Sequence, residues 1–134
     1  MAERAELSMF GKKFDILHCS YSMRRDMDPK GRPSSAVMGG TVQLEVESTE
    51  DVSILEGMLK IGKGVTVKIT FFKRDEKDQK MKEIELTNAY LVQLTETLDA
   101  TGGNPMTISF VLSARKLQIG NAELENSWPD TASN

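Results

Sequence analysis

The residues best suited to chemistry are a histidine and a cysteine that are neighbours in the chain, His18 and Cys19. A thiolate beside an imidazole could act as a nucleophile with its base, or the two side chains could bind a metal ion. The surrounding residues alternate as in a β-strand, however, and successive side chains of a strand point to opposite faces. The two groups therefore cannot act together. Because the chain has 1 histidine, we interpret His18 as a structural or interface residue.

A glycine-rich segment, residues 57–64, resembles the phosphate-binding pattern Gly-x-x-x-x-Gly-Lys. Gly64 stands where a hydroxyl side chain would hold magnesium. A phosphate-binding loop also lies between a strand and the N-terminus of the next helix, whereas this segment follows an expected helix and leads into an expected strand. We interpret Gly62 and Gly64 as the end of that helix and the start of that strand.

The pattern Asp26-x-Asp28-x-x-Gly31 imitates the opening of a calcium-binding loop. Lys30 stands where a ligand is needed, and Val37 where the bidentate glutamate belongs, so we expect a solvated turn. No other spacing marks a triad or a paired acid and base, and the charged run 73–82 is typical of a solvated hairpin end. We expect no catalytic residue, no metal and no cofactor, so the protein binds or assembles instead of catalysing.

Composition limits the class of protein further. The chain has 134 residues, a formal net charge of −3 and 1 cysteine, which predicts one domain over residues 1–134 that folds without disulfides. Bases and acids are interspersed, so neither nucleic acid nor an anionic membrane is an expected partner. No segment has the length and apolar character of a signal peptide core or a membrane span. We expect a cytosolic product with a loose tail from about residue 127.

The elements that position these residues are mostly strands, and the most regular is residues 106–117. Its apolar face is Met106, Ile108, Phe110, Leu112 and Ala114. Its polar face is Thr107, Ser109, Ser113 and Arg115. This period of two predicts a strand with one buried side. The segment Thr101-Gly-Gly-Asn-Pro105 before it predicts a sharp turn.

Alternation predicts further strands around this one. They are 5–9 and 14–23, joined as a hairpin with its turn at Gly11–Lys13, then 41–47, 65–71, 81–87 and 89–98. In the second arm of the hairpin the apolar face changes near Leu17, which predicts a bulge. In 41–47 the polar face is Thr41, Gln43, Glu45 and Glu47. After Gly120 the pattern fades.

One short amphipathic helix is expected between these strands. A capping hydroxyl in Ser48-Thr-Glu-Asp51 precedes Val52, Leu55 and Leu59 at helical spacing. About seven strands and one helix predict a mainly β fold, an antiparallel barrel or sandwich. If the sheet does not close fully, its edges must be covered by a partner chain or by charges, and self-assembly into a ring would cover them.

A long segment without periodicity, residues 26–38, is a candidate contact surface because loops of this length in compact domains are usually functional or mobile. Its candidate residues are Asp26, Asp28, Lys30, Gly31, Arg32, Pro33, Ser34 and Ser35.

Many short motifs in one order resemble a known family. They are His18-Cys-Ser-Tyr-Ser22, Gly31-Arg-Pro-Ser-Ser35, Gly39-Gly-Thr41, Glu47-Ser-Thr-Glu-Asp51, Lys73-Arg-Asp75, Asn104-Pro-Met-Thr-Ile-Ser-Phe110 and Ser113-Ala-Arg-Lys116. From about Ala5 to Trp128 the chain resembles the Bacteroidetes branch of Hcp (TssD), the tube protein of the type VI secretion system.

The resemblance implies a β-barrel with one helix that forms hexameric rings. Such rings stack into a hollow tube, which a contractile sheath expels together with a VgrG-type spike, with effectors in the lumen. It implies secretion by that apparatus without a signal peptide. It also makes the polar faces of 41–45 and 107–115 candidates for lumen or subunit contact, and the 26–38 segment a candidate for ring stacking.

Two other classes of protein stay open at this point. One is the tail-tube protein of a phage or of an extracellular contractile particle, which would assemble in a similar way. The other is a monomeric barrel that encloses a small ligand, which would have an apolar cavity and form no ring.

Overall fold

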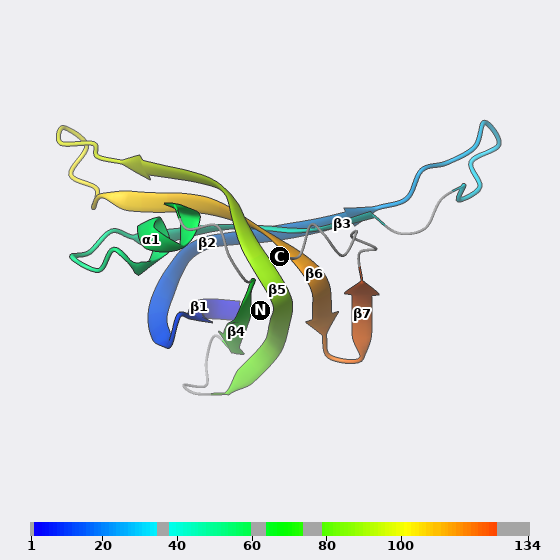
Figure 1. Ribbon diagram of the computed structural model, residues 1–134, viewed down its shortest axis with the longest axis horizontal. Helices are drawn as coiled ribbons and strands as arrows, with labels where there is room; N and C mark the ends of the chain where they lie inside the picture. The colour runs from blue at the N-terminus through cyan, green and yellow to red at the C-terminus, as the bar shows by residue number, and fades with distance from the viewer. Residues whose placement is uncertain (1, 35–37, 60–63, 74–78, 126–134) are drawn as a thin grey trace.

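The computed structural model describes residues 2–34, 38–59, 64–73 and 79–125. Within them the chain forms seven strands and one short helix (Figure 1). In order they are β1 (Ala2–Met9), β2 (Lys12–Arg24), β3 (Met38–Glu47), α1 (Ser53–Leu59), β4 (Val65–Lys73), β5 (Lys80–Thr97), β6 (Thr107–Ile119) and β7 (Ala122–Glu125). The mainly β class with one short helix is confirmed. The expected tail from residue 127 lies outside the described residues.

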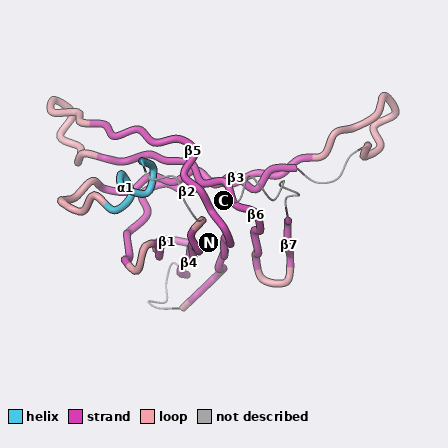
Figure 2. The backbone as a smooth tube through the Cα atoms, in the orientation of Figure 1, coloured by secondary structure: helices cyan, strands magenta, loops and turns pink. Residues whose placement is uncertain are grey.

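The strands form a closed antiparallel barrel. The sheet runs in the order β3-β2-β1-β4-β5-β6, and β3 also pairs with β6, so that the first and sixth strands of this order meet. β7 pairs with the last four residues of β6 and is not one of the six strands that close the barrel. The tube drawing in Figure 2 shows two hairpins that extend beyond the barrel toward opposite ends of the long axis, one from β2 and β3 and one from β5 and β6.

The barrel interior is filled by apolar side chains from its strands. In β6 the residues Ile108, Phe110, Leu112 and Ala114 are each at most 2% exposed, which confirms the alternation expected for this strand. Met106 was expected on the same face but lies before the strand begins and is 38% exposed. Each fully buried Leu, Ile or Phe side chain contributes about 1.5–3 kcal/mol of transfer free energy, so this face is a main source of stability.

The two strands expected at 81–87 and 89–98 are one long strand, β5. Its buried face changes within the strand, because Ile84 and Leu86 point into the barrel before Asn88 and Ala89 after it. Asn88 has a positive φ of 53°, a conformation that asparagine tolerates better than most residues. This backbone change lets β5 bend from one side of the barrel to the other without ending.

The expected bulge in β2 is confirmed, since the pairing with β3 shifts register between Ile16 and His18. Leu17 lies in this bulge and is 51% exposed, while Cys19 packs against the core. The hairpin between β1 and β2 is also confirmed. Its turn lies one residue earlier than expected, at Phe10 and Gly11, both of which have a positive φ.

Helix α1 lies where a helix was expected, but its packed face is different. Ile54 is 3% exposed, whereas Val52 and Leu59 are 50% and 82% exposed. The helix packs on Phe10 and β5 through Gly57, where a Cβ atom would come within 2.5 Å of the Phe10 ring. Helical spacing alone could not identify this face, because the closest approach occurs at a glycine.

The start of α1 is fixed by the Asp51 carboxylate and not by the hydroxyl expected within residues 48–51. The Thr49 hydroxyl accepts a hydrogen bond of 3.2 Å from the Asp51 N–H, before the helix begins. The Asp51 Oδ1 atom accepts a hydrogen bond of 2.7 Å from the Ser53 N–H, and its Oδ2 atom lies 2.7 Å from the Lys12 ammonium. Ser48 instead donates its hydroxyl to Glu96 on β5. The expected helix end at Gly62 lies outside the described residues, as do residues 60–63 of the glycine-rich segment.

Strand β7 was not expected from the sequence. It follows a turn at Gly120, whose φ is 58°, and pairs with Lys116–Ile119 of β6. Leu124 is the residue of β7 that packs on the core. One apolar residue in a strand of 4 residues gives no periodic signal, which is why alternation missed it. No helix in the described part of the chain is long and apolar enough to cross a bilayer.

Candidate assembly surfaces

The residues suited to chemistry are kept apart, as expected from their strand positions. His18 is exposed on the outer side of β2, whereas Cys19 is half-buried and packs against the core. Burial raises the pKa of the Cys19 thiol to about 11, because a buried thiolate loses its hydration. The described residues contain no group of three His, Cys, Asp or Glu side chains that could hold a metal ion.

Most of the polar residues expected on β3 and β6 lie side by side on one outer face. The register pairs Thr41 with Ser113, Gln43 with Val111, Glu45 with Ser109 and Glu47 with Thr107. The Ser109 hydroxyl donates a hydrogen bond of 3.0 Å to Glu45 Oε2. Alternation had assigned these residues to one polar face per strand, and the β3–β6 pairing joins the two faces into one surface.

This surface continues onto the two neighbouring strands. His18, Ser20 and Ser22 of β2 pair with β3, and Gln93 and Thr95 of β5 pair with β6. Together these residues of the four strands form what we call the outer polar face. They are His18, Ser20 and Ser22 of β2, Thr41, Gln43, Glu45 and Glu47 of β3, Thr107, Ser109, Val111 and Ser113 of β6, and Gln93 and Thr95 of β5. A shallow depression of about 230 Å³ lies at its centre. The sequence signal for the added residues was the alternation of polar residues at 18–22 and 93–97.

Arg115 is the predicted residue that lies apart from this face. Every second residue of β6 is buried up to Ala114, but the next buried residue is Leu117, three positions later. Arg115 lies within this change of spacing. Its neighbours in the sheet are Ala114, opposite Ala89, and Lys116, opposite Thr87. Arg115 therefore lies at the bend of the barrel, next to the change of face in β5.

Among the residues that the structure describes, each outer strand of the polar face has one unshared edge, where it pairs with no other strand. β2 pairs with β1 over its first residues, from Lys12 to Asp15. From Ile16 to Arg24 its described pairing is with β3 alone. β5 pairs with β4 only up to Ala89, so from Leu91 to Thr97 its described pairing is with β6 alone. Within the described part of the chain the four-stranded sheet therefore has two edges, although the barrel as a whole is closed.

The long segment after β2 is an ordered hairpin that projects from the barrel (Figure 1). We call residues 23–34 the arm. Near its tip Met27 forms a β-bridge with Pro33, and the Ser34 N–H donates to the Asp26 carbonyl at 2.8 Å. Backbone hydrogen bonds between Asp28 and Arg32 and between Asp28 and Gly31 close the turn.

Asp28 holds the arm tip together. Its Oδ1 atom accepts hydrogen bonds of 2.9 Å from the N–H groups of Lys30 and Arg32, and its Oδ2 atom accepts one of 2.9 Å from Arg32 Nε. The Arg32 N–H is the main cause that lowers the pKa of Asp28 below its usual value. The Asp28 carboxylate is thus hydrogen-bonded within a turn, and a turn is what the sequence predicted for this segment.

The structure brings the candidate residues of the long segment together at this projecting tip. They are Asp26, Asp28, Lys30, Gly31, Arg32, Pro33 and Ser34. Ser35 lies outside the described residues. What alternation could not reveal is that the segment is an extended hairpin, because its order comes from hydrogen bonds within the turn.

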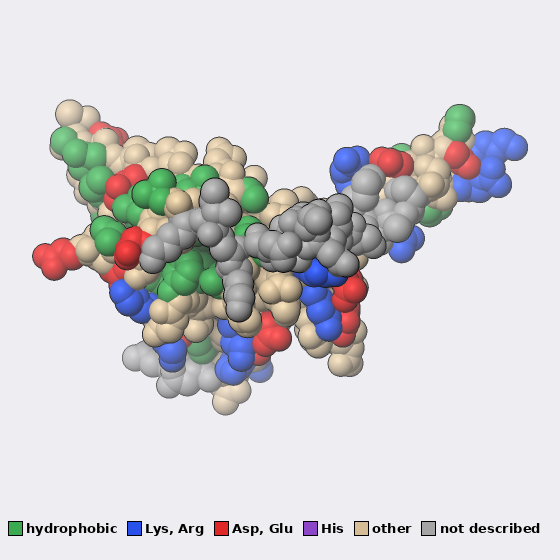
Figure 3. Space-filling view, in the orientation of Figure 1, with side chains coloured by type: hydrophobic (Ala, Val, Ile, Leu, Met, Phe, Trp, Pro, Cys, Tyr) green, Lys and Arg blue, Asp and Glu red, His purple; other side chains and the backbone are tan. Residues whose placement is uncertain are grey.

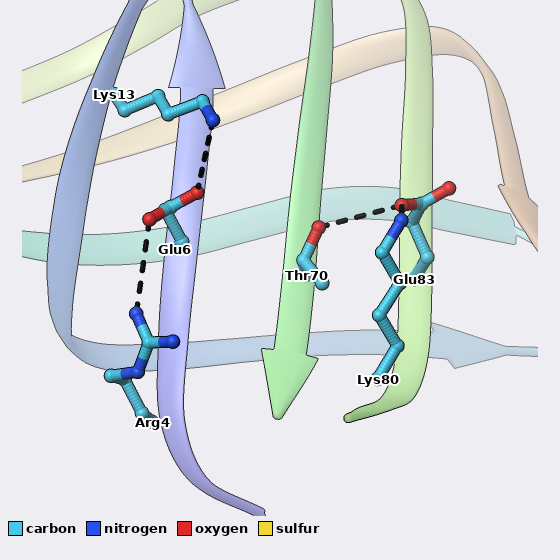
Figure 4. Close-up of polar contacts among 6 residues, drawn as sticks. All are labelled: Arg4, Glu6, Lys13, Thr70, Lys80 and Glu83. Atoms are coloured by element: carbon cyan, nitrogen blue, oxygen red, sulfur yellow. Dashed lines mark hydrogen bonds and ion pairs between the residues drawn. The ribbon is translucent and has the colours of Figure 1, made fainter. Parts of the chain in front are cut away.

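The opposite side of the barrel has a different chemical character. Figure 4 shows carboxylates on its strands paired with bases: Glu6 lies 3.8 Å from both Arg4 and Lys13, and Glu83 lies 3.2 Å from Lys80. Exposed pairs of this kind contribute about 0–1 kcal/mol each. This side is therefore a solvated charged surface, in contrast to the mostly uncharged outer polar face.

Comparison with known proteins places the chain in one family. The model of hemolysin coregulated protein Hcp (TssD) matches residues 1–129. No curated protein matches the chain. Among solved structures, Hcp1 from Flavobacterium johnsoniae is 35% identical, with 92% of this chain and 100% of that chain covered and a TM-score of 0.87.

More distant structures share the fold. Hcp1 from Salmonella typhimurium is 10% identical, with 92% of each chain covered and a TM-score of 0.70. A chain of the sheath-tube complex of PVC, an extracellular contractile injection system, is 18% identical, with 89% of each chain covered and a TM-score of 0.57. The match over residues 1–129 and the 35% identical Hcp1 show that the chain belongs to the Hcp (TssD) family of type VI secretion tube proteins.

Proposed function

We propose that the protein forms hexameric rings that stack into the hollow tube of a type VI secretion system. The observation that supports this most strongly is the four-stranded sheet with two unshared edges. Unpaired backbone groups on a strand edge favour pairing with another chain. An edge on each side of one sheet allows every copy to bind two others through the same pair of surfaces.

The strand directions are consistent with such a ring. In the order β2-β3-β6-β5 each neighbour is antiparallel, so β2 and β5 run in opposite directions. When β5 of one copy meets β2 of the next copy after rotation about an axis along the strands, the two edges are antiparallel and can pair. A contact between two different surfaces of identical chains closes into a ring when the rotation closes.

In this arrangement the outer polar face lines the lumen. Its side chains are mainly hydroxyls and amides, among them Thr41, Gln43 and Ser109. Its ionisable side chains include His18, Glu45 and Glu47. Neutral polar groups keep their hydration and make no strong charge pairs, so cargo can move past them. The charged opposite side would then face outward, toward the contractile sheath.

The partners follow from the same proposal. They are other copies of this chain, the sheath, a VgrG-type spike at the end of the tube, and effectors in the lumen. The protein is made in the cytosol and leaves the cell through the apparatus, without inserting into the membrane. No nucleic acid and no cofactor takes part.

We also propose that the protein has no catalytic turnover. His18 and Cys19 face opposite sides, and the Cys19 thiol is protonated at neutral pH because its pKa is about 11. A panel of ester, peptide and glycan substrates should give no hydrolysis above background. Reproducible hydrolysis that is lost in the His18→Ala variant would contradict this.

The arm is proposed to connect one ring to the next. It projects beyond the sheet along the strand direction, where a stacked ring would lie (Figure 1). Deleting Gly31–Ser35 should leave ring formation intact and impair stacking and secretion. A matched control is deletion of five residues elsewhere, residues 74–78 of the charged run between β4 and β5, which should leave stacking and secretion intact. Normal tubes from the Gly31–Ser35 deletion would contradict a stacking role.

The alternative of a monomeric barrel around a small ligand has less support. The barrel interior is occupied by large side chains such as Leu7, Ile69, Ile84, Phe110 and Leu117, each at most 2% exposed. Light scattering separates the two functions, because a ligand-binding barrel would stay monomeric at high concentration. A tube in another contractile particle would assemble in the same way, and neighbouring genes for that particle would distinguish it.

A further inference from the structure

The two ends of the outer polar face differ in shape and charge. One end carries the arm, which projects away from the barrel, and the other end carries the turn between β5 and β6 (Figure 2). Figure 3 shows Lys and Arg side chains gathered on the arm, and acidic and hydrophobic side chains at the opposite end. In a stack of rings, the arm end of one copy meets the turn end of another.

A cleft of about 390 Å³ lies at the turn end. Its walls include the apolar side chains of Leu17 and Pro105 and the carboxylates of Glu45 and Asp99. Asp99 is held in place, because its Oδ1 atom accepts hydrogen bonds of 3.2 and 3.0 Å from the N–H groups of Thr101 and Gly102. None of the described residues that line the cleft is basic, and residues 88–114 contain no Lys or Arg.

The arm has the complementary chemistry. Its basic residues are Arg24, Arg25, Lys30 and Arg32, and its acidic residues are Asp26 and Asp28. Both acids are already paired, Asp26 with Arg24 and Asp28 with Arg32. The positive charges of Arg25 and Lys30 therefore remain, beside an apolar side chain, Met27, that is 72% exposed.

We propose that the arm tip of one copy seats in this cleft of a second copy in the neighbouring ring. Met27 enters between Leu17 and Pro105, and Lys30 approaches the carboxylates of Glu45 and Asp99. This inference rests on the proposed tube and identifies the surface that receives the arm. It also makes the stack polar, because every arm points to the same end.

A second acidic cleft is a poorer receptor. It has a volume of about 240 Å³ and is lined by Glu83, Glu85, Gln118 and Gly120. Its described lining has no apolar side chain for Met27 to contact, and this cleft lies on the charged side of the barrel and not at the end of the four-stranded sheet. Its residues therefore provide matched control positions for the same experiment.

Cysteine cross-linking tests the contact directly. Met27→Cys and Thr97→Cys are combined in one chain, since Thr97 lines the cleft and is exposed. The control chain combines Met27→Cys with Gln118→Cys. Native Cys19 stays in both, because a half-buried thiol with a raised pKa reacts slowly. Purified protein is oxidised with copper phenanthroline and analysed on non-reducing gels, with rings checked by electron microscopy.

The Met27→Cys/Thr97→Cys chain should give a ladder of covalent multimers that collapses on reduction, because each copy joins two others. A disulfide requires Cα atoms within about 7 Å, so non-contacting positions stay unlinked. Rings without this ladder, or an equal ladder from the Gln118 control, would overturn the arm–cleft contact and leave the ring proposal standing. Absence of any rings would overturn both.

Discussion

At the scale of single residues, the close approach of Gly64 to Asn88 determines how β5 passes from one side of the barrel to the other. A Cβ atom on Gly64 would lie 2.7 Å from the Cα and 2.8 Å from the carbonyl carbon of Asn88. These are backbone atoms, and Asn88 is already held at a φ of 53°. The main chain therefore has little freedom to move away.

Gly64→Ala should accordingly destabilise the protein by about 1–3 kcal/mol, the usual cost of overpacking. Urea unfolding followed by circular dichroism measures this change. Thr66→Ala is a matched control, since Thr66 is an exposed residue of β4 two positions after Gly64, and it should stay within about 0.5 kcal/mol of the wild type. Equal stability of Gly64→Ala and Thr66→Ala would show that the approach is looser than the structure indicates.

At the scale of elements, the position of α1 depends on the Asp51 carboxylate. The Lys12 ammonium and the Ser53 donors lower the pKa of Asp51 to about 2, from 3.8. Because the folded-state pKa is the lower one, the charged carboxylate stabilises the fold above about pH 4. That contribution is lost as the pH falls toward 2.

The Asp51→Asn variant should therefore be less stable than the wild type at neutral pH, and the difference should shrink between about pH 4 and pH 2. Thermal unfolding at a series of pH values measures it. Glu50→Gln, a neighbouring exposed acid, serves as the control. A difference between wild type and Asp51→Asn that does not change over this pH range would contradict the role of the Lys12–Asp51 pair.

Some of these elements could be predicted from the sequence, whereas their pairing in space could not. Strands β3, β4 and β6 follow from alternation, because one face of each is buried and the other is not. The closure of β3 on β6 could not be predicted, since it joins residues about 65 positions apart, such as Glu45 and Ser109, without a local signal. The joined polar face was therefore found only in part, and its residues on β2 and β5 were missed.

At the scale of the whole molecule, the two unshared edges of the four-stranded sheet should control assembly. Val92 lies in a bulge on the β5 edge and is 54% exposed. Lysine at such a position is one way in which proteins prevent edge pairing. Val92→Lys should keep the barrel folded and weaken the ring, so that at least a tenfold higher concentration is needed, which corresponds to about 1.4 kcal/mol.

Sedimentation velocity over a concentration series measures that shift. Thr66→Lys, which adds the same charge to an exposed position on β4, should assemble as the wild type does. An unchanged ring in Val92→Lys, together with a normal unfolding transition, would mean that the β5 edge is not part of the ring contact.

The most direct test of the central claim is electron microscopy of the purified wild-type chain at high concentration. The account predicts rings with sixfold symmetry and an open centre, in which the strands of the outer polar face surround the hole. Solitary particles of one chain at every concentration, or rings with that face turned outward, would contradict it.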